Sequence, residues 1–269
     1  MARELGGAVG RSSKPVCFIL GAGCSLTSDA PSTKAVDEAL RDATSARFDG
    51  MELRDALHVM PEHEKQDILR PLFARVRPAR GYLALAALAK HRLVTVLNLN
   101  WDDALTQACE QAHARCEVRD IRQLEPDWPG DMNSGLINLH VHGMVGDECR
   151  YGRIETLSFT APETEWLLTH GLAYTTVIIG ASMEDETDFT GVFDKWAEAN
   201  GNRRPTASQW FFSRSARDEG PADRLRSTNV RTQAFTNVRE PGVDFDTIAT
   251  LITDRALGTI LGSTLTTGR

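Results

Sequence analysis

The sequence lacks the cysteine patterns of a disulfide-stapled or zinc-stabilised protein. Its 269 residues contain five cysteines, an odd number, and no two of them form a C-x-x-C pair. A disulfide framework needs an even number of cysteines, and zinc ribbons use closely spaced cysteine pairs. We therefore expect a cytoplasmic protein of a reducing compartment, without a structural metal.

The sequence also lacks long apolar runs and an excess of positive charge. No segment approaches the roughly 20 apolar residues that cross a bilayer, and the first residues lack the apolar stretch of a secretion signal. Lys and Arg number 30 against 37 Asp and Glu, which gives a formal net charge of −7. Because nucleic acids and anionic membranes attract basic proteins, neither is expected as a principal partner.

One basic stretch departs from this acidic balance. Its members are Arg70, Arg75, Arg77, Arg80, Lys90 and Arg92. Runs of like charge usually form a solvated surface, which is the interpretation we favour here. Contact with an acidic partner or a nucleic-acid backbone is the alternative.

What the sequence does contain is an alternation of buried strands and helices. Strand patterns occur at residues 16–20, 93–97, 136–141, 175–179, 209–213 and 230–235. Helical patterns occur at 32–47, 102–113, from Pro162, 188–199, 222–226 and 245–256. Such alternation predicts an α/β fold, a Rossmann-like parallel sheet with helices on both faces.

The length fits one domain, and both ends look different from it. We expect a domain over residues 15–261, with a helical insertion at 50–91 between the first two strands. The Gly- and Ser-rich residues 1–14 and the tail 262–269 are predicted to be disordered.

Glycine and polar clusters follow four of the predicted strands, and ligands of open parallel sheets bind beyond the carboxyl ends of strands. The first such cluster is Gly21-Ala22-Gly23-Cys24-Ser25. Glycines here permit a sharp turn and a close approach to a pyrophosphate. A tight turn without a ligand explains them equally well, since the third glycine of G-x-G-x-x-G is absent.

Polar residues follow the second and third strands as well. Asn100 and Asp102 come after the second, where they can hold a ribose, a water or a carboxamide, or cap the next helix. His140 and His142 end the third strand, and His142 beside a glycine can act as a general base. An H-x-H pair can also hold a metal, and lone histidines are often structural.

A fourth cluster, Gly180-Ala181-Ser182-Met183-Glu184-Asp185, follows the strand at 175–179. Glycine followed by serine suits close approach to a ribose or a phosphate, although it also suits a plain turn.

Taken in order, the four blocks GAGCSLTSDAP, LNWDDAL, HVHGMV and VIIGASMEDETDF resemble the signature blocks of bacterial sirtuin-like NAD hydrolases. The resemblance spans roughly residues 15 to 250. It implies that NAD is the substrate and that Asn100 and His142 are catalytic. It also implies a set of NAD-binding residues: Gly21, Ala22, Gly23, Ser25, Asp102, Gly180, Ser182 and Asp185.

The resemblance implies a reaction and a setting. The reaction is cleavage of NAD to nicotinamide and ADP-ribose or a cyclic product. The setting is bacterial antiphage defence, with activation by self-association or by a separate protein. The chain departs from protein-deacylating sirtuins, because Asp29-Ala30-Pro31-Ser32-Thr33 replaces their G-I-P-D-F-R run and the four-cysteine zinc module is missing.

Two alternatives from other classes remain. The domain could bind NAD or ADP-ribose as a sensor without cleaving it. A metal-dependent hydrolase could use His140 and His142 with a neighbouring aspartate, although this leaves the glycine cluster unexplained.

Overall fold

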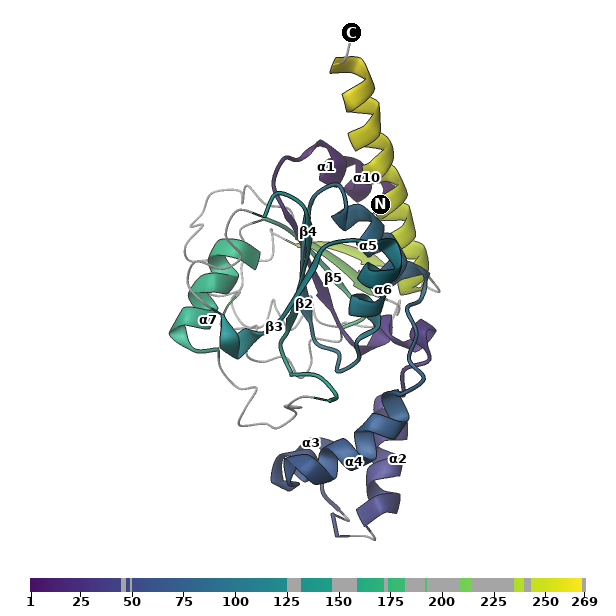
Figure 1. Ribbon diagram of the computed structural model, residues 1–269, viewed down its shortest axis with the longest axis vertical. Helices are drawn as coiled ribbons and strands as arrows, with labels where there is room; N and C mark the ends of the chain where they lie inside the picture. The colour runs from purple at the N-terminus through teal and green to yellow at the C-terminus, as the bar shows by residue number, and fades with distance from the viewer. Residues whose placement is uncertain are drawn as a thin grey trace.

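The computed structural model has a seven-stranded, entirely parallel sheet with strand order β3-β4-β2-β1-β5-β6-β7 (Figure 1). It describes residues 1–44, 47–48, 50–124, 132–146, 159–171, 174–181, 192, 209–213, 235–239 and 243–267. The strands are β1 (Val16–Leu20), β2 (Leu93–Asn98), β3 (Cys116–Asp120), β4 (Gly135–His140), β5 (Thr175–Ile179), β6 (Gln209–Ser213) and β7 (Phe235–Arg239). The predicted α/β class and Rossmann-like sheet are confirmed.

The direction of the chain across the sheet reverses at β1. This strand pairs with β2 on one side and β5 on the other, so that Leu20 lies between Asn98 and Ile179. All five β1 residues are buried, as the continuous apolar run predicts. The turns after these three strands therefore meet at one edge, at the switch point where open α/β sheets bind ligands.

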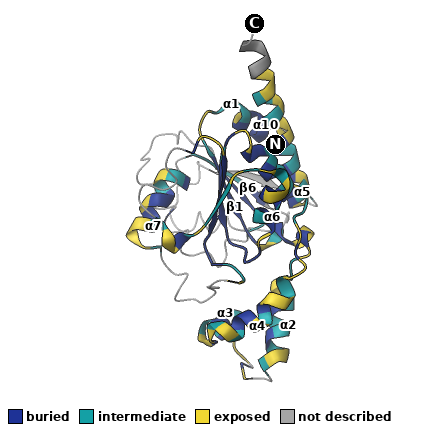
Figure 2. Cartoon of the chain, in the orientation of Figure 1, coloured by how far each residue is buried: buried dark blue, intermediate teal, exposed yellow. Residues whose placement is uncertain are grey.

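Helices cover both faces of the sheet, as predicted. One face carries α1 (Ala2–Arg11), α5 (Arg80–Ala89), α6 (Ala104–Ala112) and α10 (Phe245–Thr267), and the other carries α7 (Ala161–Trp166) with a π-helical turn, Leu167–Gly171 (Figure 1). Each face of the sheet has its own hydrophobic core, and successive side chains of a strand pack into opposite cores. Phe18 packs into the first core and Ile19 into the second. The burial colours of Figure 2 follow this layering, with the central strands dark and the outer helix faces exposed.

The N-terminal residues form a helix where we predicted a disordered leader. Helix α1 packs along α10, and its Leu5 and Val9 are buried. The glycines that suggested disorder have a packing role instead. A Cβ built on Gly6 would lie 2.4 Å from the carbonyl oxygen of Ile252, so the two helices touch backbone to backbone.

The C-terminal tail was also mispredicted. Helix α10 continues through residue 267 and extends past the sheet (Figure 1), so residues 262–267 are helical instead of disordered. Only 268–269 of the predicted tail lie outside the described residues. The run from Thr259 to Thr267 contains no proline, and Gly262, the residue that suggested an earlier end, lies inside the helix.

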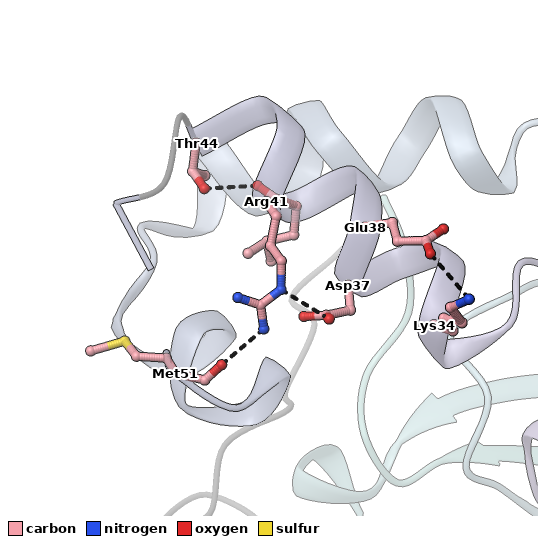
Figure 3. A network of polar contacts seen from close by, with 7 residues as sticks. Lys34, Asp37, Glu38, Arg41, Thr44 and Met51 are labelled. Atoms are coloured by element: carbon pink, nitrogen blue, oxygen red, sulfur yellow. Dashed lines mark hydrogen bonds and ion pairs between the residues drawn. The ribbon is translucent and has the colours of Figure 1, made fainter. Parts of the chain in front are cut away.

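Three helices form a small module with its own core below the sheet (Figure 1): α2 (Thr33–Thr44), α3 (Leu53–Val59) and α4 (Glu62–Phe73). Arg41 ties α2 to the loop that leads into α3, because its guanidinium donates to Asp37 Oδ2 of α2 at 3.0 Å and to the Met51 carbonyl of the loop at 3.0 Å (Figure 3). Trp101, beyond β2, packs into this core and connects the module to the sheet. The insertion predicted at 50–91 thus contributes α3 and α4 to the module and α5 to the sheet face.

Two strands differ from the sequence prediction. Strand β3 was missed, because its Cys116–Asp120 sequence is half-exposed at the sheet edge and has no continuous apolar run. The last strand is Phe235–Arg239, later than the predicted 230–235. The predicted helices at 188–199 and 222–226 lie outside the described residues, apart from Val192. Among the described helices, none combines the length and apolar character of a bilayer span.

Candidate functional site

A cavity lies where the carboxyl ends of β1 and β2 meet the helical module. Its volume is about 60 Å³. The sheet side contributes Ala22 and Ser25 after β1 and Asn100, Trp101 and Asp102 after β2. The module side is apolar and includes Val36, Leu53 and Phe73. Four residues predicted as site residues from the sequence, Ala22, Ser25, Asn100 and Asp102, therefore come together at one cavity.

A buried tyrosine of α5, Tyr82, connects these site residues. The Tyr82 hydroxyl lies 2.7 Å from Ser25 Oγ and accepts a hydrogen bond from Asn100 Nδ2 at 3.3 Å. Tyr82 is fully buried and packs on Phe245, with ring centroids 4.9 Å apart. Its position on α5, far from every glycine or Asn-Asp block in the sequence, left no local signal of this role.

The tyrosine is a neutral hydroxyl group. Burial, together with the charge of Asp102, raises the pKa of Tyr82 well above its ordinary value. Since Asn100 Nδ2 can only donate, Tyr82 Oη accepts there and its own proton is free to go to Ser25. This arrangement leaves the Ser25 proton available for Asp102.

Asp102 is a buried carboxylate with one unpartnered oxygen. Its Oδ1 accepts the Ala104 N–H at 3.0 Å, which confirms the predicted capping role at the start of α6. Its Oδ2 is buried and has no geometrically satisfactory hydrogen bond to the described residues. Burial raises the pKa of Asp102, and the nearby Ser25 hydroxyl and the Ala104 N–H partly oppose this rise. An orphaned oxygen at a cavity wall is a ready acceptor for a ligand donor.

The glycines after β1 and β5 pack against each other. A Cβ on Gly21 would lie 2.5 Å from the Ala181 Cα, and one on Gly23 would lie 2.9 Å from the Gly180 oxygen. The N–H of Gly23 donates to that same oxygen at 2.9 Å. The glycines after β1 therefore allow close contact with the turn after β5, where Gly180 has a φ of 69°. This packing agrees with the tight turn considered from the sequence, and the approach to a pyrophosphate stays a prediction.

Asp29 begins the Asp29-Ala30-Pro31-Ser32-Thr33 run after the first glycine cluster. It adopts a left-handed conformation with φ of 60° and ψ of 22°. Aspartate tolerates this region better than most residues with a side chain, since its short polar group can bond locally. An aspartate can therefore occupy the turn that leads to Ala30 and Pro31 at the cavity.

His140 and His142 are both buried at the end of β4, but they do not line the cavity. Both ring nitrogens of His140 have partners, the Asn100 carbonyl at 3.2 Å and Asn138 Nδ2 at 3.2 Å. Burial lowers the pKa of His140, with the Asn100 bond opposing this. His140 is thus a neutral structural residue that holds the backbone of Asn100.

Two hydrogen bonds hold the segment after His142 against the residues around the cavity. The Val145 N–H donates to the Trp101 carbonyl at 2.8 Å, and the Gly146 N–H donates to Gln66 Oε1 of α4 at 2.8 Å. The helical module therefore holds both the cavity and the turn that carries His142. Gln66 is a further residue that sequence analysis did not single out.

Ser182 and Asp185 lie outside the described residues. Across the described ranges, no group of three or more His, Cys, Asp or Glu side chains is arranged to hold a metal ion. The engaged nitrogens of His140 also argue against the H-x-H metal site considered from the sequence.

Comparison with known proteins supports the fold. No family model matches the sequence, and no curated protein matches it. Among solved structures, the chain is similar to a Sir2 homologue solved as a complex with NAD, with a TM-score of 0.52 and 12% sequence identity. The similarity covers 96% of this chain and 94% of the other. The sirtuin-like fold is thus shared over nearly the whole length.

Proposed function

We propose that this protein is an NAD glycohydrolase that splits NAD into nicotinamide and ADP-ribose or a cyclic product. The observation that carries the proposal is the convergence of Ser25, Asn100 and the orphaned Asp102 oxygen on one cavity at the switch point of the sheet. The order of the four sequence blocks and the shared fold with an NAD-bound Sir2 homologue support the same substrate.

The cavity suits one end of the substrate. Its 60 Å³ is well below the roughly 300–1,000 Å³ of pockets that enclose whole ligands. Only part of a dinucleotide therefore fits between the module and the sheet, and the rest must extend along the strand ends. We assign this part to the nicotinamide riboside end, where bond cleavage would occur, because the cavity wall there is buried and polar.

The reaction requires little acid catalysis from the protein. Nicotinamide is cationic in NAD and leaves as a neutral molecule when the bond from its ring nitrogen to the ribose C1′ breaks. The site must stabilise the cationic sugar that forms and admit a nucleophile, water or a hydroxyl of the substrate itself. A buried carboxylate near that sugar favours its positive charge, and Asp102 is such a group.

Asn100 and His142 would handle the nucleophile. The Asn100 side chain is fixed by Tyr82 and its main chain by Asn98 and His140, so it can orient a ribose hydroxyl and water with little loss of entropy. His142 would accept the proton released as the new C1′–O bond forms. Because His142 lies beyond the cavity wall, this role needs the segment after β4 to shift when NAD binds.

The test measures nicotinamide released from NAD by the parent chain and by Asn100→Ala and His142→Ala. We expect each variant to lose about 100-fold or more in turnover, the usual contribution of a positioned proton-transfer group. His63→Ala is the matched control, because His63 is exposed on α4 away from the cavity, and it should retain parental turnover. Equal turnover in all four proteins would refute the residue assignments.

A sensor is the second candidate function, favoured by the small volume of the cavity, about 60 Å³. It predicts NAD binding without nicotinamide release at every protein concentration. The glycohydrolase proposal predicts release that rises more steeply than protein concentration if self-association activates the chain, or release on addition of an activating protein. The setting we propose is NAD depletion in antiphage defence, following the sequence resemblance.

A further inference from the structure

A second pocket opens at the other end of the strands, where β1, β2 and β4 begin. It has a volume of about 390 Å³, within the range of ligand pockets. The end of α1, the start of β1, the turn before β2 and one side of α10 form its walls. Five residues of strand separate it from the candidate site, a length of roughly 16 Å.

The pocket wall combines positive charge with hydrogen-bond donors. Its polar groups of interest are Ser12, Ser13, Lys14, His91, Arg92 and Ser263, and the described wall contains no Asp or Glu. Lys14 and His91 are exposed at the rim, and Arg92 is only 8% exposed. Because the chain has a net charge of −7, basic residues without a carboxylate in the described wall reverse the overall charge locally.

Arg92 is a buried charge without a carboxylate partner among the described residues. Its guanidinium donates to the carbonyls of Val9 and Lys14, which ties the end of α1 to the start of β1. Its Nε is buried and has no hydrogen-bond partner in the described part of the chain. Burying an unpaired charge is costly, and an anion in the adjoining pocket would offset that cost.

We propose that this basic pocket binds the phosphate group of a small-molecule anion. Arg92 and Lys14 supply charge, and the Ser12 and Ser13 hydroxyls supply donors to the several oxygens of a phosphate. Inorganic phosphates and nucleotides share this chemistry. Because Arg92 also holds the last turn of α1, an anion in the pocket would stabilise that turn, far from the NAD cavity.

The test is calorimetric titration of the full chain with pyrophosphate in buffer free of phosphate and sulfate. Lys14→Ala combined with His91→Ala should weaken binding at least tenfold. The matched control is Lys90→Ala combined with His63→Ala, which removes the same formal groups from exposed positions outside the wall and should leave binding unchanged. Equal affinities for both double variants, or no binding to the parent chain, would overturn the proposal.

Two further arms locate the anion and identify its source. Asn100→Ala should bind pyrophosphate as the parent does, whereas a loss of affinity there would place the anion in the NAD cavity and overturn the proposal. This arm does not depend on NAD turnover, so it fails or succeeds independently of the glycohydrolase activity. Tighter binding of AMP than of phosphate would identify the ligand as a nucleotide. Equal affinities for AMP and phosphate would identify it as the bare anion. Succinate binding as tightly as phosphate would overturn the phosphate class.

Hydrogen exchange gives a readout on the fold itself. The Ser12 N–H donates to the carbonyls of Ala8 and Val9 in the last turn of α1, beside Arg92. Pyrophosphate should slow exchange of this amide, while exchange in the helical module stays the same. Unchanged exchange at Ser12 under saturating pyrophosphate would contradict the proposed site.

Discussion

Replacing Asp102 with asparagine should stabilise the protein while impairing its function. The carboxylate is 3% exposed, and its Oδ2 has no hydrogen-bond partner among the described residues. Leaving a buried polar atom unsatisfied costs about 1–3 kcal/mol, and more when it is charged. Asparagine keeps the Oδ1 that accepts from Ala104 and places an N–H₂ group near the Ser25 hydroxyl.

We therefore expect Asp102→Asn to raise the free energy of unfolding by about 1–3 kcal/mol near pH 8. For a chain of this length each kcal/mol corresponds to roughly 3 °C in Tm. Asp103→Asn is the matched control. Asp103 is the exposed neighbour, and its substitution should change stability by less than about 0.5 kcal/mol.

The stabilisation should depend on pH with a defined sign. Burial raises the pKa of Asp102 in the folded state, so the folded chain holds its proton to higher pH than the unfolded chain. Below the unfolded pKa of about 4, the side chain is protonated in both states, and its burial costs the parent no stability. As pH rises from there through the folded pKa, the free energy of unfolding of the parent falls. The advantage of Asp102→Asn over the parent should grow across that window.

The assay is urea unfolding of the parent and both variants at several pH values between 4 and 8. Nicotinamide release is measured in parallel and should fall for Asp102→Asn, because a neutral amide no longer stabilises the cationic sugar. If Asp102→Asn is less stable than the parent at pH 8, or if the difference in stability does not vary with pH, then Asp102 is not a buried carboxylate that lowers stability and serves the reaction.

Three other perturbations test the packing around the site. Tyr82→Phe should cost about 2 kcal/mol in urea unfolding and raise KM for NAD, because it leaves Ser25 and the Asn100 amide without their shared partner; unchanged KM would remove Tyr82 from the site. Gly180→Ala should lower the free energy of unfolding by about 3 kcal/mol more than Gly50→Ala does. Both glycines have positive φ, but only Gly180 would place a Cβ 2.6 Å from a backbone nitrogen. Equal Tm losses would contradict this. Gly6→Ala should lower Tm and Gly7→Ala should not, because only the former meets α10 backbone; matching Tm values would disprove the α1–α10 contact.

The sequence predicts the centre of this fold better than its periphery. Strands such as β1 and β5 are buried on both faces, so their apolar runs mark them directly. The edge strand β3 has no such run, because one of its neighbours is solvent. The glycines of α1 were misleading since they serve helix contact, which depends on a partner, α10, that lies more than 200 residues away in the chain.

The site was predictable where residues act next to a strand end and not where they act from a distance. Ser25, Asn100 and Asp102 follow β1 and β2 directly, and the parallel sheet brings them together. Tyr82 reaches the same network from α5, and its aromatic character on an apolar helix face resembles any core residue. Local sequence patterns do not contain such a contact.

The most direct test of the NAD site is a crystal structure of the slow variant Asn100→Ala with NAD bound. We predict that the nicotinamide riboside enters the cavity between the helical module and the sheet, with a donor group of the ligand bonded to Asp102 Oδ2. NAD bound with its nicotinamide riboside away from Ser25 and Asp102, on any other surface of the domain, would contradict this account.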